Sequence, residues 1–147
     1  MNIIKKVFSH QSLIDKPPVL IDLGASGEIH KKWKAIAKHS ICIAFDADTR
    51  DFKPTITEGC GWKKLYSLNR LVLADEKKMS DFYLTKSPHC SSALQPDNDA
   101  LKPWIFSHLF KVERSIKLPS LSLNASLFDI GIDYIDWYKT DTQGTDL

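Results

Sequence analysis

The sequence has few of the features that mark secreted or metal-binding proteins. Cysteine occurs only three times in 147 residues, as Cys42, Cys60 and Cys90, and no Cys-x-x-Cys pair is present. An odd number of widely spaced cysteines does not form a disulfide framework, and Cys42, between two isoleucines, is expected to be a buried reduced thiol. The five histidines show no metal-ligand spacing. We therefore expect no metal site.

Long apolar runs and a strong charge of either sign are also missing. No stretch is long enough to cross a bilayer, and Pro17-Pro18 interrupts the only N-terminal segment that could resemble a signal peptide. We therefore expect no membrane span and a cytoplasmic location. The formal net charge is only +2, and the lysine pairs are scattered. This balance does not favour nucleic acid or an anionic membrane as a partner.

The length is that of one domain at most. Residues 1–17 are expected to form an N-terminal helical extension, because Ile3, Ile4, Val7 and Phe8 can share one face of a short helix. Residues 18–147 are expected to form the domain itself.

The most informative segment is Leu20–Gly27, which reads Leu-Ile-Asp-Leu-Gly-Ala-Ser-Gly. An apolar run passes through Asp22 into a turn of small residues, Gly24 and Ala25, that let backbone approach a ligand closely. A second apolar run about twenty residues later ends in Asp46. Strand, glycine turn, helix, strand and acid is the order typical of a nucleotide-type cofactor bound at the carboxyl ends of parallel strands. Asp46 is then a candidate acceptor for a ribose diol.

The segment between these two runs has helical spacing. Ile29, Trp33, Ile36 and Ala37 fall on one helix face, and Ser26 or Gly27 can begin the helix. The glycine pattern is not Gly-x-Gly-x-x-Gly, because the third glycine is missing, and this disfavours a nicotinamide dehydrogenase. A purely structural turn between strand and helix stays open as an alternative.

The middle of the chain is less regular. Residues 47–61 read as an irregular loop, and residues 64–68 and 70–74 as strands. The segments 70–74 and 81–85 are expected to pair as a hairpin across a polar turn. Residues 86–103, with three prolines, are expected to form a long loop that either carries function or only connects.

The C-terminal third predicts a strand from Val112, then a short helix within 122–130 closed by Gly131. The apolar and aromatic content of 132–141 predicts another central strand. It ends in the polar turn Asp141-Thr142-Gln143-Gly144, which would lie at the ligand-binding edge of a parallel sheet.

Together these motifs resemble the FkbM family of S-adenosylmethionine-dependent methyltransferases. The last of the matching segments is the most family-specific, and the first is shared with many methyltransferases. The segments are Leu20–Gly27, Ala44–Asp48, Leu73–Asp75 with Phe82–Leu84, Ser91–Leu94, and Tyr134–Asp146, which resembles the family pattern I-D-x-x-K-x-D-x-x-G-x-E.

The resemblance implies S-adenosylmethionine as cofactor and an O-methyltransferase acting on a hydroxyl of a sugar or secondary metabolite. The cofactor-binding residues it implies are Asp22, Gly24, Ala25, Ser26, Gly27, Asp46 and Asp75. The sequence departs from the family at Glu28, where glycine is common, and at Asp46 and Asp146, where glutamate is usual.

The implied fold is α/β, a Rossmann-like class I methyltransferase sheet truncated after the fourth strand. The family continues through a fifth strand and an antiparallel sixth–seventh pair, so the chain is expected to be a partial methyltransferase domain. A non-catalytic fragment that binds the cofactor or a partner chain is the alternative function. The exposed sheet edge, with Tyr134, Ile135 and Trp137, would then favour self-association.

Asp141 is the candidate catalytic residue. A methyl transfer needs alignment of donor and acceptor, and a nearby acid or base can take the hydroxyl proton. A carboxylate at the strand end would also favour a positive sulfonium. The alternative is that Asp141 caps a following helix. For Lys139 we favour an interior ion pair over a catalytic role.

Overall fold

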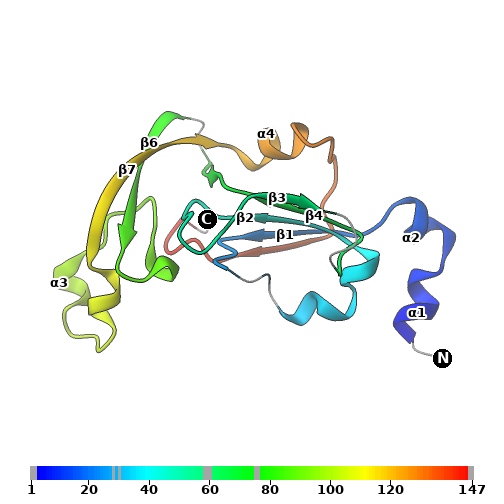
Figure 1. The fold of residues 1–147 in the computed structure, drawn as a ribbon, viewed down its shortest axis with the longest axis horizontal. Helices are drawn as coiled ribbons and strands as arrows, with labels where there is room; N and C mark the ends of the chain where they lie inside the picture. Colours follow the sequence, from blue (N-terminus) through cyan, green and yellow to red (C-terminus); the bar gives the residue numbers. More distant parts are fainter. Residues whose placement is uncertain (1–2, 28, 30, 58–60, 75–76, 146–147) are drawn as a thin grey trace.

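The computed structural model describes residues 3–27, 29, 31–57, 61–74 and 77–145. The described chain is an α/β structure with two sheets, one of five strands and one of three. Figure 1 shows the five-stranded sheet in the middle of the molecule, with α1 and α2 at one end and the long β6–β7 pair curving away toward the other.

Four parallel strands make up most of the larger sheet. The order across the sheet is β3-β4-β2-β1-β8, and only the short β3 runs antiparallel to its neighbour. All five residues of β1 are buried, in keeping with a strand that is apolar at every position except Asp22. The strands are β1 (Val19–Leu23), β2 (Ile41–Phe45), β3 (Thr55–Thr57), β4 (Lys64–Leu68) and β8 (Trp137–Thr140).

The connection from β1 to β2 was expected to be an α-helix and is instead two 3₁₀-helices, η1 (Lys31–Ala35) and η2 (Ala37–His39). The predicted apolar face is still the buried one, since Trp33 and Ala37 are both buried. A 3₁₀-helix rises about 2.0 Å per residue against about 1.5 Å for an α-helix. A 3₁₀ path over residues 31–39 therefore covers about 18 Å, close to the roughly 17 Å length of a five-residue strand.

The smaller sheet has the order β5-β7-β6, so the expected hairpin between 70–74 and 81–85 is wrong. β5 (Leu71–Val72) is parallel to β7 (Val112–Leu121), and β6 (Lys77–Thr85) is antiparallel to β7. β7 offers β6 a partner along nearly its whole length, from Ser120 to Val112. Backbone pairing over that length outweighs pairing with the two-residue β5, and the local turn rule cannot see such a distant partner.

The expected short helix after β7 is present as α4 (Leu123–Phe128). The Ser122 side chain accepts a hydrogen bond from the Ala125 N–H at 3.1 Å, and Gly131 follows with φ +71°. Short helices also occur in the expected N-terminal extension and in the expected loop 86–103. They are α1 (Ile3–Phe8), α2 (Gln11–Asp15), η3 (Pro88–Cys90), α3 (Asn98–Leu101) and, just beyond, η4 (Ser107–Phe110).

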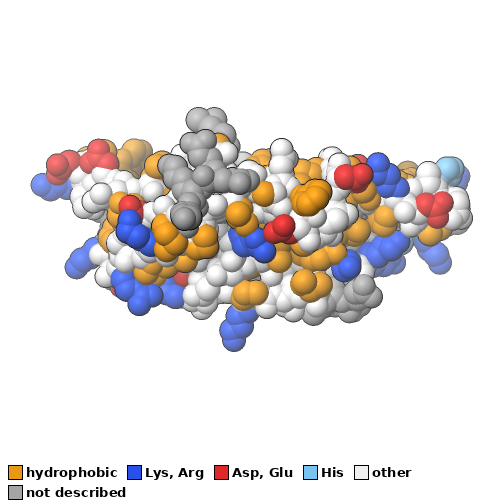
Figure 2. Space-filling view, turned by 90° about the horizontal axis from the view of Figure 1, so that it is seen from above, with side chains coloured by type: hydrophobic (Ala, Val, Ile, Leu, Met, Phe, Trp, Pro, Cys, Tyr) orange, Lys and Arg blue, Asp and Glu red, His pale blue; other side chains and the backbone are white. Residues whose placement is uncertain are grey.

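Strand β8 was expected to be central but lies at the edge of the five-stranded sheet as described. Trp137 is 55% exposed, Tyr138 is 51% exposed, and Ile135 is exposed too. Tyr134 is not part of this exposed region, because its ring packs on the core and its hydroxyl donates to the Pro17 carbonyl at 2.7 Å. Apolar side chains also gather in the middle of the face seen from above, near α4 (Figure 2).

Among the described helices, none combines the length and the apolar character that crossing a bilayer requires.

Candidate functional site

A cavity of about 140 Å³ opens where β1, β2 and β8 end at their carboxyl sides. Its apolar wall comes mainly from the ends of β1 and β2, from β5 and from β6. Its polar lining includes Ser26, Asp46, Arg70, His89, Asp141 and Gln143. The cavity thus combines a few polar groups with apolar walls at the sheet edge where ligands of parallel sheets are bound.

The turn after β1 is held against β2 by backbone hydrogen bonds. The Gly24 and Ala25 N–H groups both donate to the Phe45 carbonyl, at 2.9 and 3.1 Å. Gly24 has φ +72°, and a Cβ placed on it would lie 2.0 Å from the Asp141 carbonyl oxygen. The expected close approach at Gly24 therefore exists, but the group that approaches is the backbone after β8. The need for glycine at this position does not depend on a ligand.

Asp46 fastens the two loops that border the cavity. Its Oδ2 accepts from the Ser26 N–H and its Oδ1 from the Asp48 N–H, each at 2.7 Å. Burial raises the pKa of the Asp46 carboxyl above its ordinary value, against the opposing effect of these two hydrogen bonds. Each carboxylate oxygen keeps a second lone pair, so the carboxylate can still accept from a ligand.

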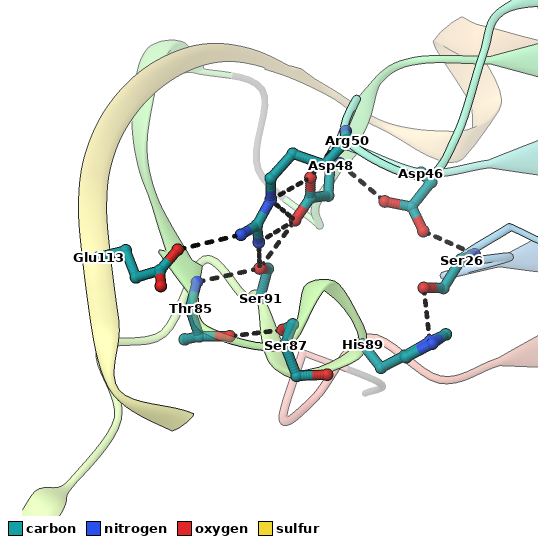
Figure 3. A network of polar contacts seen from close by, with 9 residues as sticks. All are labelled: Ser26, Asp46, Asp48, Arg50, Thr85, Ser87, His89, Ser91 and Glu113. Atoms are coloured by element: carbon teal, nitrogen blue, oxygen red, sulfur yellow. Dashed lines mark hydrogen bonds and ion pairs between the residues drawn. The ribbon is translucent and has the colours of Figure 1, made fainter. Parts of the chain in front are cut away.

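Ser26 and His89 meet across the cavity mouth, with the Ser26 Oγ 2.7 Å from the His89 Nδ1 (Figure 3). Ser26 belongs to the turn after β1, and His89 to η3. The contact joins two segments that are far apart in the sequence, and no spacing rule relates them. His89 was not among the predicted site residues.

A second polar cluster next to the cavity was also missed. The Asp48 side chain is almost fully buried and accepts from Arg50 Nη2 at 2.6 Å and from the Ser91 Oγ at 2.9 Å. Ser91 also accepts from the Thr85 N–H, and Arg50 lies 3.5 Å from the Glu113 carboxylate (Figure 3). The sequence held one local signal for this cluster. Aspartates in turns accept a hydrogen bond from the backbone N–H two residues on, and Asp48 accepts one from the N–H of Arg50.

The environment of Asp48 makes this cluster sensitive to pH. Burial alone would raise the pKa of Asp48, but hydrogen bonds from Arg50 and Ser91 and the Arg50 charge hold it below its ordinary value. A lowered pKa in the folded state contributes stability above the unfolded-state pKa of about 3.9. That contribution is lost as the pH falls through the lower folded-state pKa.

We expect Arg50→Met to lower the free energy of unfolding by about 2–3 kcal/mol at pH 7, since Asp48 stays buried without its cation. Burial would then raise the pKa of Asp48, so the deficit should shrink as the pH falls toward 4 and Asp48 takes up a proton. Urea denaturation at both pH values measures this. The control is Arg70→Met, whose 3.4 Å pair with Asp129 is exposed. A deficit that is the same at both pH values would contradict the assignment.

Asp22 and the half-buried Lys139 form an ion pair beneath the cavity. Asp22 is fully buried, and the Lys139 Nζ lies 2.9 Å from its Oδ1 and donates to the Gly24 carbonyl at 3.2 Å. The two residues face each other in the register of β1 and β8. The favoured interpretation of Lys139 as an ion-pair partner is therefore confirmed. Asp22 serves this pair and does not line the cavity.

Asp141 lies at the cavity, directly after β8. Its N–H donates to the Leu23 carbonyl at 3.0 Å, and its Oδ1 accepts from the Gln143 Nε2 at 3.0 Å. The alternative was that Asp141 caps a following helix, but no helix follows it in the described part of the chain. Its carboxylate instead accepts the hydrogen bond from the Gln143 side chain. The side chain is exposed, which leaves the carboxylate accessible.

The structure thus separates the predicted cofactor residues into two groups. Gly24, Ser26 and Asp46 line the cavity together with Asp141, whereas Asp22, Ala25 and Gly27 do not. Asp75 lies outside the described residues. Within those residues, no group of three or more His, Cys, Asp or Glu side chains is placed to hold a metal ion.

Comparisons with protein-family models, with curated proteins and with solved structures found no match. What the cavity binds must therefore be inferred from its residues and their geometry.

Proposed function

We propose that the chain is an S-adenosylmethionine-dependent O-methyltransferase and that the cavity at the strand ends binds the cofactor. The observation that supports it best is the meeting of the Gly24–Ser26 turn with Asp46 and Asp141 in one cavity. The parallel strands run in the order β4-β2-β1-β8, so this cavity lies beside the first strand, where the fold expected of class I methyltransferases places its cofactor. The FkbM resemblance belongs to the same proposal.

The residues present suit an adenosyl group. Asp46 offers carboxylate oxygens for a ribose diol, and apolar walls from Phe45, Leu71 and Phe82 offer a surface for a base. Both Asp46 oxygens already accept one backbone N–H each, so the carboxylate is held in a fixed orientation. The bound cofactor would supply an electrophilic methyl group.

Asp141 would act on the hydroxyl that accepts the methyl group. Its exposed carboxylate, oriented by Gln143, can accept the proton that a sugar or metabolite hydroxyl loses. The same negative charge would favour a positive sulfonium nearby. His89 is a second titratable group at the cavity. Its hydrogen bond to Ser26 holds it against the turn after β1.

A second candidate is a chain that binds the cofactor or a partner without catalysis. The observation that favours it is the position of β8 at the edge of the described sheet, where Trp137 and Tyr138 are exposed. Such an edge can pair with another chain, including a second copy.

Asp46→Ala should weaken S-adenosylmethionine binding by about 10- to 150-fold, because the lost charged acceptor contributes about 1.5–3 kcal/mol. Isothermal titration calorimetry measures the affinity, and Asp133→Ala is a matched control because Asp133 is exposed and lies away from the cavity. Asp46→Asn, which keeps one acceptor oxygen, should have an intermediate effect.

Loss of the Asp46 hydrogen bonds to the loops could also loosen the fold, so urea denaturation of each variant accompanies the titrations. Equal affinities for wild type and Asp46→Ala would remove Asp46 from the cofactor site. Tighter binding of NAD than of S-adenosylmethionine by the wild type would overturn the methyltransferase proposal altogether.

A further inference from the structure

The segment 102–111 presents an exposed apolar surface that the candidate site does not use. Ile105 is 93% exposed, Trp104 is 57% exposed and Phe106 is also exposed. The segment follows α3, at the end of the molecule opposite α1 and α2 (Figure 1). It therefore projects away from the five-stranded sheet.

These side chains are held in place by local structure. The Trp104 and Phe106 rings stack with centroids 5.5 Å apart, and the Phe110 ring lies 6.2 Å from that of Phe106. The Ser107 N–H donates to the Trp104 carbonyl at 3.0 Å, and the Ser87 N–H donates to the Leu109 carbonyl at 3.1 Å, which fastens the segment to η3. An ordered apolar surface loses little conformational entropy on binding.

The charged residues at the two ends of this segment are lysines. Lys102 and Lys111 flank it, both exposed, and the exposed Lys86 is brought beside Lys111 by a 2.8 Å backbone hydrogen bond. No acidic residue occurs between 102 and 111. The nearest acids are Asp97 and Asp99 before the segment and Glu113 after it. Asp97 caps α3, Asp99 lies in the first turn of that helix, and Glu113 faces Arg50.

We propose that segment 102–111 docks on the surface of an anionic lipid bilayer, with Ile105 and Trp104 entering the interface and the three lysines contacting headgroups. Segments that anchor a protein at the membrane–water interface typically combine Trp, Phe and an exposed aliphatic residue with neighbouring lysines. Juxtaposed lysines add attraction to acidic lipids. This contact lies on the bilayer surface and requires no membrane-spanning helix.

Cosedimentation with vesicles of phosphatidylcholine, with and without phosphatidylserine, tests the proposal. We expect binding to the phosphatidylserine vesicles that weakens with added salt. Ile105→Ser should weaken it about tenfold, and Lys102→Glu or Lys111→Glu at least about fivefold each. Wild-type tryptophan fluorescence should shift to the blue on binding, and Trp104→Phe should lose this shift.

Two matched variants control for general effects. Phe128→Ser removes another strongly exposed apolar side chain, 85% exposed on α4, and Lys34→Glu reverses an exposed lysine on η1. Neither should change vesicle binding. The proposal is overturned if anionic vesicles do not bind the protein, or if the controls weaken binding as much as Ile105→Ser. It is equally overturned if size-exclusion chromatography shows a dimer that Ile105→Ser dissociates, because a second copy would then cover the segment.

Discussion

Replacing Gly24 with alanine should lower the free energy of unfolding by about 2–5 kcal/mol. Positive φ costs an L-residue about 1–2 kcal/mol, and forcing atoms into a packed space adds about 1–3 kcal/mol. The added Cβ would lie 2.0 Å from the Asp141 carbonyl oxygen and 2.8 Å from its carbon. The backbone after β8 would have to move, which breaks the bond from the Asp141 N–H to the Leu23 carbonyl.

Gly131→Ala is the control for this effect. Gly131 has φ +71°, almost the same as Gly24, but a Cβ there meets nothing within 4 Å. Its substitution should therefore cost only the conformational part, about 1–2 kcal/mol. Urea denaturation of both variants separates the two contributions, and equal losses would mean that the close approach to Asp141 does not exist.

Replacing Lys139 with methionine should cost about 3–5 kcal/mol, because it leaves the fully buried Asp22 without its cation. Methionine keeps most of the side-chain length, so little packing is lost with the charge. The end of β8 should also loosen from the glycine turn, since Lys139 donates to the Gly24 carbonyl. Chemical denaturation gives the stability, and hydrogen exchange of the β8 amides reports the local loosening.

The exposed pair between Lys117 and Asp81 provides the comparison. The Lys117 Nζ lies 3.2 Å from the Asp81 Oδ1, yet both side chains are largely exposed, so Lys117→Met should change stability by less than about 1 kcal/mol. Removing both charges of the pair, with Asp22→Asn and Lys139→Met together, should recover part of the loss because no uncompensated charge remains. If Lys139→Met proves as mild as Lys117→Met, the buried pair contributes little to stability.

Sequence reasoning located the elements that depend on local pattern. β2 is a continuous apolar run and β1 is apolar except for Asp22, and runs of that kind form buried parallel strands. The Ser122 cap and Gly131 delimit α4 because capping depends on neighbouring residues only. Sequence reasoning also placed several site residues at one edge of the sheet, because the carboxyl ends of parallel strands lie there together. The residues that line the cavity at this edge are Gly24, Ser26, Asp46 and Asp141.

What sequence reasoning missed depends on contacts between distant segments. The partner of β6 is β7 and not the nearby β5, and pairing between distant strands leaves no periodic signal in either one. The same is true of the Ser26–His89 contact and of the Asp48–Arg50–Ser91 cluster, which join residues up to 63 positions apart.

By itself, then, the sequence determined which runs become buried strands and where the chain turns, because burial and capping act over a few residues. Tertiary structure alone decided what each side chain does there. It turned Asp22 into an ion-pair partner, made Gly24 a packing requirement of the Asp141 backbone, and paired β6 with β7. It also gathered Lys86 beside segment 102–111. These outcomes depend on distances between segments, which backbone pairing and core packing set only once the whole chain has folded.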